Sequence, residues 1–383
     1  MIVHVFNSSI VSGPETLVIP ALPKLGQPVQ VIILTEARKG EEGRAPVEYA
    51  RQFGLTVHEI IVRSRFDRGA IKTLRDLLEE IKPQILHAHD VKASAYTLWA
   101  VKKLKDCAPK LVSTHHGVRA RRGWKIKLLE QFYVHCILPQ YDGVLAVCSS
   151  DRELLIKRGL PEEKVFLHLN GVDRALIRPE EREGAATEVR EKWGITNLGI
   201  KEGTLILGYA GRISSEKGLD RIFKVLKSLM EIEGVPEWVL LIFGKGNYEY
   251  PLKQLANDLG IAKHLRWMGY RQKLGSEMAG FDLLFSMSDA EGLPINLLEA
   301  AWAGTPVFCT AVDGICDLIN WDEETALVSP TDPENKMAKR LAKMISDPHF
   351  REQFAIKFQE RVKDTFSGVQ WLRNLTTIYS KIS

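Results

Sequence analysis

The chain has 383 residues, which is enough for two domains of ordinary size. Its hydrophobic fraction of 45% and charged fraction of 26% are typical of a globular protein, and its net charge of +4 is too small to argue for nucleic-acid binding. No run of about 18 apolar residues is present, so no transmembrane helix is expected. The opening letters M-I-V-H-V-F predict a strand rather than a signal peptide.

The cysteines form no C-x-x-C pair, and several lie in apolar runs such as L-A-V-C and P-V-F-C. This pattern predicts reduced core residues and a cytoplasmic protein. The five are Cys107, Cys136, Cys148, Cys309 and Cys316.

The first half of the chain alternates short β-branched runs with helical patterns, for example over 69–81 and 93–105. This alternation predicts βαβ units and a parallel sheet. Strands are expected over 2–6, 29–34, 56–62, 85–89, 110–114, 143–147 and 165–169.

The charged, apolar-poor stretch 172–203 predicts a hinge and a domain boundary. A second α/β series follows it, with helices over 218–232 and 250–259. The amphipathic segment 366–382 comes after that series, and we expect it to cross back to the first half. Strands of the second series are expected over 204–209, 238–243, 264–268, 282–286 and 305–308.

The stretch A-G-R-I-S-S-E-K-G-L-D, 210–220, places Arg212 and Lys217 in a small polar turn between a strand and a helix. A guanidinium fork and an ammonium point charge together suit a diphosphate. The alternative interpretation is a solvated turn with two surface cations.

The stretch S-D-A-E-G-L-P-I-N-L-L-E-A, 288–300, predicts a loop and then a helix over 294–303 that begins at Pro294. The first-turn N–H groups of Ile295, Asn296 and Leu297 would be unpaired, which makes an anion site. Glu299 could bind a ribose diol, and Glu291 could bind sugar hydroxyls. The alternative is a helix cap with a surface glutamate.

The loop 7–17 follows the first strand, where doubly wound folds bind ligands, and Gly13 is its best residue for a close phosphate approach. The alternative is an N-cap loop. The sequences L-H-A-H-D and S-T-H-H-G place four histidines at strand ends. Their spacing gives only a weak zinc signal, and a structural role for any one of them is the alternative. His116 is the strongest single prediction of a cleft residue.

The segment 117–133 carries five cations beside apolar residues and a tryptophan. Such a helix can lie on an anionic membrane surface or bind an acidic acceptor. A solvated basic face is the alternative. The cations are Arg119, Arg121, Arg122, Lys125 and Lys127.

Taken in order, these motifs resemble the family 4 retaining glycosyltransferases of the GT-B fold. The resemblance covers most of the chain: the first glycine loop, H-A-H-D, T-H-H-G, L-N-G-V-D, A-G-R-I-S-S-E-K-G, I-F-G-K-G, and the pair Glu291 and Glu299 with E-A-A-W-A-G-T-P-V. The chain departs from the family at S-G-P-E, where two adjacent glycines are common, and at Pro294, where glycine is common.

The resemblance implies two Rossmann-like parallel-sheet domains that face a cleft. They would be an acceptor-binding domain over 1–175 and a donor-binding domain over 176–365, followed by a crossover helix over 366–383. Arg212 and Lys217 would hold the diphosphate, Glu299 the ribose, and Glu291 the transferred sugar, with His116 near the reacting carbon. The other donor contacts implied are Gly13, Asn170, Gly211, Gly244, Met268, Gly292, Leu293, Pro294 and Ile295.

The implied activity is retaining transfer of a sugar from a UDP- or GDP-sugar to a glycan or lipid-linked acceptor in bacterial cell-surface polysaccharide synthesis. No metal is expected, because the chain contains no D-x-D pair. A peripheral contact with the inner face of the membrane through 119–127 is expected, and no nucleic acid. A nucleotide-sugar epimerase and a non-catalytic nucleotide-sugar-binding protein are the alternatives.

Overall fold

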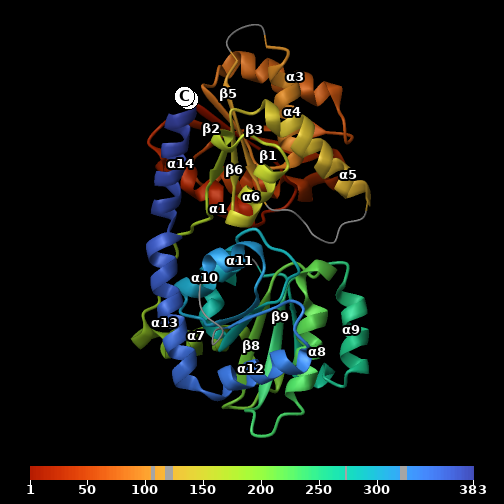
Figure 1. Cartoon of the computed structure of the whole chain (residues 1–383), viewed down its shortest axis with the longest axis vertical. Helices are drawn as coiled ribbons and strands as arrows, with labels where there is room; N and C mark the ends of the chain where they lie inside the picture. The colour runs from red at the N-terminus through yellow and green to blue at the C-terminus, as the bar shows by residue number, and fades with distance from the viewer. Residues whose placement is uncertain (105–107, 117–123, 272–273, 320–325) are drawn as a thin grey trace. The chain divides into compact units, whose positions relative to one another are not determined.

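The computed structural model describes residues 1–104, 108–116, 124–271, 274–319 and 326–383. They form two compact units (Figure 1). The first unit holds the described residues up to Gly171 together with Gly368–Ser383, and the second holds Val172–Ser367. No helix in the described part is both long and apolar enough to cross a membrane.

The first unit is built on a parallel sheet with the strand order β3-β2-β1-β4-β5-β6-β7. Helices cover both faces, so the inner strands β1, β4 and β6 are buried, whereas the edge strands β3 and β7 are partly exposed. The strands are β1 (Ile2–Asn7), β2 (Val29–Glu36), β3 (Thr56–Val62), β4 (Ile85–Ala88), β5 (Lys110–His115), β6 (Gly143–Ala146) and β7 (Val165–Leu167). The helices are α1 (Gly13–Val18), α2 (Ala45–Arg51), α3 (Arg68–Ile81), α4 (Val91–Val101), α5 (Trp124–Phe132), α6 (Ser149–Lys157) and α14 (Gly368–Ile382).

The second unit repeats the plan with the strand order β10-β9-β8-β11-β12-β13. Every residue of strand β9 (Trp238–Phe243) is buried, as an inner parallel strand requires. Its strands are β8 (Leu205–Ala210), β9 (Trp238–Phe243), β10 (Leu265–Gly269), β11 (Leu283–Ser286), β12 (Val307–Thr310) and β13 (Leu327–Val328). Its helices are α7 (Arg182–Trp193), α8 (Leu219–Leu229), α9 (Glu249–Asp258), α10 (Ile295–Trp302), α11 (Asp313–Leu318), α12 (Glu334–Ser346) and α13 (Pro348–Thr365).

The stretch predicted as a hinge contains helix α7, which packs into the second unit. The Trp193 indole N–H donates to Glu277 Oε2 at 2.8 Å. The same ring lies 5.0 Å from the Phe243 ring and 4.9 Å from the Phe281 ring, centroid to centroid. A single buried tryptophan therefore anchors a helix whose other residues are mostly polar, which is why composition alone suggested a linker.

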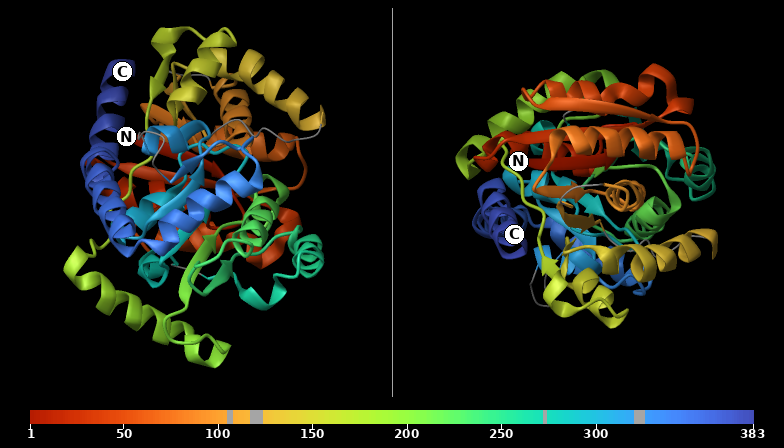
Figure 2. Two further views of the ribbon diagram at one scale, coloured as in Figure 1. Left: turned by 60° about the horizontal axis from the view of Figure 1, so that its bottom comes forward. Right: turned by 90° about the horizontal axis from the view of Figure 1, so that it is seen from above.

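Helix α14 belongs to the first unit although it ends the chain, and both termini lie close together in the two views of Figure 2. Its Tyr379 hydroxyl is hydrogen-bonded to His87 Nδ1 at 2.6 Å, and the Trp371 carbonyl is 3.1 Å from His168 Nε2. A Cβ on Gly143 would lie 2.3 Å from Ile382 Cδ1, so the helix packs tightly on β6.

The prediction that the cysteines are core residues is only partly right. Cys148 and Cys309 are buried, but Cys136 and Cys316 are exposed, and Cys107 lies outside the described residues. The apolar runs L-A-V-C and P-V-F-C end in the two buried cysteines, whereas the two exposed cysteines lie in helical segments rather than strands.

The first unit holds a buried set of histidines, so its stability should depend on pH. Burial lowers the pKa of His115 from 6.5 to about 4, and the charge of Arg158 acts in the same direction. The unfolded chain therefore binds a proton between pH 6.5 and 4 that the folded chain does not. Stability contributed by neutral His115 is complete above pH 6.5 and is lost as the pH falls, at about 1.4 kcal/mol per pH unit.

His115→Phe keeps a ring against Tyr133, whose centroid is 6.0 Å away, and removes the proton site. We expect the free energy of unfolding of the variant to fall less steeply than that of the wild type over this window. Denaturant titrations at several pH values measure the difference, which cancels the contributions of all other groups. His135→Gln, at an exposed histidine of the same unit, is the control. Equal slopes for wild type and His115→Phe would contradict the prediction.

Candidate functional site

The predicted site residues of the second unit lie at one edge of its sheet. Gly211 follows β8, Gly244 follows β9, Met268 lies in β10 beside an irregularity of register, and Glu291 follows β11. Because the strands are parallel, these are all carboxyl ends, where open α/β sheets bind ligands.

The loops after β8 and β9 touch each other through their backbones. The Gly211 N–H donates to the Phe243 carbonyl at 3.0 Å, and a Cβ on Gly244 would lie 1.8 Å from the Gly211 oxygen. A Cβ on Gly246 would lie equally close to the carbonyl oxygen of Ile213. Only glycine fits at these two positions, and the edge there is lined by bare backbone.

Lys217 and Glu291 form an ion pair, with 2.6 Å between Nζ and Oε1 and with 24% and 12% of their side chains exposed. The Ser288 hydroxyl donates to the same oxygen at 2.6 Å. The two residues are 74 positions apart in the sequence, and they meet because β8 and β11 are neighbouring strands. The structure therefore brings together a cation and a carboxylate that sequence analysis had placed in separate motifs.

Arg212, the other predicted diphosphate ligand, is more exposed. Its guanidinium lies 3.2 Å from Glu216, and its carbonyl accepts a hydrogen bond from the buried Tyr209 hydroxyl at 2.7 Å. Burial raises the pKa of Tyr209, and the negative charge of Glu291 raises it further, so this hydroxyl stays a neutral donor. The Arg212 backbone is thus fixed, while its side chain reaches into solvent.

A second ion pair ties the loop after β11 to helix α8, and sequence analysis missed it. Arg221 donates to the Met287 carbonyl at 2.6 Å and to Asp289 Oδ1 at 2.8 Å, and both side chains are largely buried. The Asp289 N–H in turn donates to the Glu216 carbonyl at 3.0 Å. The helical spacing that makes Arg221 a neighbour of Lys217 was the available signal.

The backbone of Glu291 is held by the turn after β12. Its N–H donates to Asp313 Oδ2 at 3.2 Å, and its carbonyl accepts from the Gly314 N–H at 3.3 Å. Asp313 has a φ of +34°, which a non-glycine residue rarely adopts and which marks stored strain. Asp313 was also missed, because nothing in A-V-D-G separates it from an ordinary turn acid.

Helix α10 begins one residue later than predicted, with Pro294 as its N-cap and Ile295 as its first residue. The Leu297 N–H donates back to the Pro294 carbonyl at 3.2 Å, so the prediction that it is unpaired is wrong. Among the described residues, the amides of Ile295 and Asn296 have no such partner. The Asn296 side chain donates to the Ala210 carbonyl at 2.8 Å and fixes this helix start beside the end of β8.

Glu299 lies inside α10, as predicted, but it has an unforeseen partner. Arg174 donates twice to its Oε1, at 3.0 Å from Nε and 2.6 Å from Nη2. A Cβ on Gly275 would lie 2.3 Å from the Glu299 carboxyl carbon, so the glycine makes room for the carboxylate. Both partners come from segments outside the motif, Arg174 directly after N-G-V-D. The remaining predicted residues of this loop, Gly292 and Leu293, lie between Glu291 and the N-cap.

Three predicted residues lie in the first unit. Gly13 begins α1, and its carbonyl accepts from the Thr16 hydroxyl at 3.0 Å. Asn170 is buried. His116 follows β5, with its ring centroid 6.3 Å from that of His89. Burial lowers the pKa of His116 to about 4, so it is neutral at pH 7.

Among the described residues, one group of histidines has ring nitrogens close enough together to hold a metal ion. Ligand atoms of His4, His87 and His89 lie within 4.8 Å of one another. However, His4 Nδ1 and His89 Nε2 are already hydrogen-bonded at 2.8 Å, and both His87 nitrogens have partners in Tyr379 and Thr114. These contacts describe a hydrogen-bonded cluster in the core of the first unit.

The basic segment cannot be placed. Arg119, Arg121 and Arg122 lie outside the described residues, as do the side chains of Lys125 and Lys127, although the backbone of α5 is helical.

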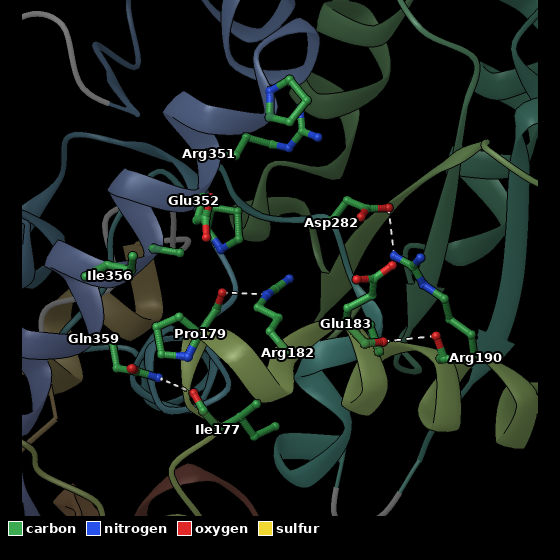
Figure 3. A pocket seen from close by; sticks show the side chains of 16 residues that line it. Ile177, Pro179, Arg182, Glu183, Arg190, Asp282, Arg351, Glu352, Ile356 and Gln359 are labelled. Atoms are coloured by element: carbon green, nitrogen blue, oxygen red, sulfur yellow. Dashed lines mark hydrogen bonds and ion pairs between the residues drawn. The ribbon is translucent and has the colours of Figure 1, made fainter.

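A separate cavity of about 480 Å³ lies at the opposite, amino edge of the second sheet, beside Asp282 and Pro306 (Figure 3). Arg182 donates there to the Gly304 and Phe281 carbonyls at 2.5 and 2.7 Å, and Arg190 pairs with Asp282 at 2.8 Å. These arginines join α7 to the ends of the strands, so the contacts are structural.

Two family models match the chain in succession. The model of Glycosyltransferase Family 4 matches residues 17–176, and the model of Glycosyl transferases group 1 matches residues 195–361. Together they account for most of the chain. The chain therefore belongs to the family 4 glycosyltransferases, which confirms the family that the motif order predicted.

Characterised relatives transfer sugars to several acceptors. The UDP-Gal:α-D-GlcNAc-diphosphoundecaprenol α-1,3-galactosyltransferase of Escherichia coli is 26% identical over 256 residues, which is 65% of this chain and 63% of that protein. A GDP-mannose-dependent phosphatidylinositol monomannoside mannosyltransferase of Corynebacterium glutamicum is 27% identical over 71% of this chain and 70% of its own length.

Solved structures share the fold over the whole chain. Anabaena HepE in complex with UDP-glucose has a TM-score of 0.79 at 16% identity, with 99% of both chains covered. Sucrose-phosphate synthase from Thermosynechococcus elongatus has a TM-score of 0.77 at 15% identity, covering 100% of this chain and 98% of that one. The predicted GT-B fold is confirmed.

Proposed function

We propose that this protein is a retaining, metal-independent glycosyltransferase that moves a sugar from a UDP- or GDP-sugar to a glycan or lipid-linked acceptor in cell-surface polysaccharide synthesis. The observation that carries the proposal is the Lys217–Glu291 pair beside the α10 amides of Ile295 and Asn296, at the carboxyl edge of the second sheet. The donors and acceptors in the names of the relatives support the substrate classes.

The proposed chemistry follows from where charge develops. As the glycosidic C–O bond breaks, its electrons pass to the diphosphate, which Lys217, Arg212 and the α10 amides stabilise. The acceptor hydroxyl bonds to the anomeric carbon on the same face, and its proton goes to the departing phosphate oxygen. Glu291 holds hydroxyls of the transferred sugar, and Glu299, which Arg174 orients, holds the ribose. The roles of Gly13, Asn170 and His116 stay predictions.

Thermal unfolding with a panel of UDP-, GDP-, ADP- and CMP-sugars tests the donor site. Selective binding stabilises the folded chain by about 2.7 kcal/mol at a hundredfold excess over Kd. We expect one nucleotide to raise the melting temperature of the wild type and of Glu237→Gln, an exposed control, but not that of Glu299→Gln. No shift with any nucleotide in folded protein would contradict the donor assignment.

The reaction is tested by incubating the selected donor with a bacterial lipid fraction and determining the anomeric configuration of the product by NMR. We expect transfer with the configuration retained. Conversion of the donor to a stereoisomer without an acceptor would instead show an epimerase, and binding without turnover would show a non-catalytic binding protein. An inverted product would contradict the proposed same-face attack.

A further inference from the structure

The first unit contains a second feature that the donor site does not use, a cavity of about 510 Å³. It lies beside the carboxyl ends of β2 and β3, between the turn after β3 and helices α4 and α5. Its volume is within the usual range for a small-ligand site. The apolar walls are formed by Tyr96, Trp99, Leu129, Phe132 and Ile137.

Apolar side chains are exposed around this cavity. Leu129 and Phe132 on α5 are 53% and 46% exposed, and the neighbouring Leu128 is 64% exposed. Phe66 is 50% exposed, and its ring lies 4.9 Å from that of Trp99, edge to face. Several large apolar side chains exposed beside one cavity of a globular protein indicate a binding surface.

The rim of the cavity is basic. Arg63, Arg65 and Lys92 line it, against the single carboxylate of Glu36. Lys92 is 3.7 Å from Glu36, whereas the exposed guanidinium groups of Arg63 and Arg65 form no ion pair with any side chain that the structure describes. A guanidinium group can donate two parallel hydrogen bonds to two oxygens of one phosphate. The basic rim therefore complements an anionic headgroup, and the apolar walls complement a hydrocarbon chain.

We propose that this cavity binds the start of the lipid of a polyprenyl-diphosphate-linked acceptor, with the isoprenoid chain against Trp99 and Phe132 and the diphosphate at Arg63 and Arg65. One cavity with predominantly apolar walls suits a single branched chain better than the two acyl chains of a glycerolipid. The two guanidinium groups of Arg63 and Arg65 suit a diphosphate. The inference rests on the proposed function, because it names which of the proposed acceptors the enzyme uses.

Calorimetric titration of the full chain with farnesyl diphosphate tests the cavity without a donor. Farnesol and inorganic diphosphate carry the chain and the charge separately, and we expect both to bind more weakly than farnesyl diphosphate. Ala95→Phe, on the α4 wall, fills the cavity, and the double variant Arg63→Gln/Arg65→Gln removes the rim charges. Each should weaken farnesyl diphosphate binding by about tenfold or more.

Arg51→Gln/Lys72→Gln is the matched control, because both cations are exposed in the same unit and do not line the cavity. Its affinity should equal that of the wild type, and circular dichroism checks that every variant is folded. Farnesyl diphosphate binding that is absent from the wild type or unchanged in both cavity variants would overturn the inference. So would binding of all variants to phosphatidylglycerol vesicles without any affinity for farnesyl diphosphate.

The same variants separate this inference from the proposed function. Donor nucleotides should stabilise Ala95→Phe as much as the wild type, because Lys217, Glu291 and Glu299 lie in the second unit and none of the predicted donor residues lines the cavity. If transfer to lipid proceeds while the cavity variants keep their affinity, the inference fails and the function stands. If the variants lose affinity but no nucleotide sugar binds the wild type, the cavity assignment stands and the transferase proposal fails.

Discussion

Lys217→Gln is expected to lower kcat by about 10² to 10³, because it removes the half-buried cation that is proposed to stabilise the charge developing on the leaving diphosphate. Lys217 is less exposed than Arg212, the other predicted diphosphate cation. Glu291 orients Lys217 through an ion pair with 2.6 Å between Nζ and Oε1. Losing Lys217 also leaves that carboxylate with fewer donors, at a cost of about 1–3 kcal/mol in the free energy of unfolding. Thermal unfolding must therefore accompany the kinetics.

A double-mutant cycle with Glu291→Gln shows whether the pair acts as a unit. If each residue acts through the other, the double variant loses less than the product of the two single losses. The control is Lys227→Gln, because Lys227 and Glu231 form an exposed pair on the same unit, 3.7 Å apart. A kcat of Lys217→Gln that equals that of the control would remove Lys217 from the proposed mechanism.

Gly218→Ala is expected to destabilise the protein by about 4 kcal/mol or more, which is a large effect for a substitution that only adds one methyl group. Gly218 has a φ of +67°, and a Cβ there would lie 1.8 Å from the Met287 carbonyl oxygen. Since that carbonyl is backbone and is fixed by Arg221, it cannot move aside cheaply. The new methyl group would push the loop after β11 away from α8 and carry Glu291 with it.

Gly260→Ala is the matched control for this variant, because its φ is +69° and a Cβ there meets nothing within 4 Å. It should cost only the left-handed conformation, about 1–2 kcal/mol. Denaturant unfolding of both variants isolates the steric part. If Gly218→Ala and Gly260→Ala lower the free energy of unfolding equally, the loop after β11 moves aside for the methyl group. The prediction of a rigid contact between Gly218 and the Met287 carbonyl would then be wrong.

The sequence predicts the strands well because parallel strands covered on both faces must be continuous apolar runs. Each expected strand overlaps an observed one, whereas the two-residue β13 is too short to show a pattern. Helix α7 was missed for the opposite reason. Its surface is polar, and its place in the unit depends on Trp193 reaching rings of Phe243 and Phe281 that are distant in the sequence.

The sequence by itself determined the family and the GT-B fold, and it supplied the residues predicted for the donor site, because local patterns of glycine, charge and apolar runs carry that information. Only the tertiary structure decided the partners: Lys217 with Glu291, Arg174 with Glu299, and Asp313 behind the Glu291 backbone. These contacts join segments 22 to 125 residues apart. They depend on which strands lie side by side, and strand order is a property of the whole packed sheet that no single stretch of sequence contains.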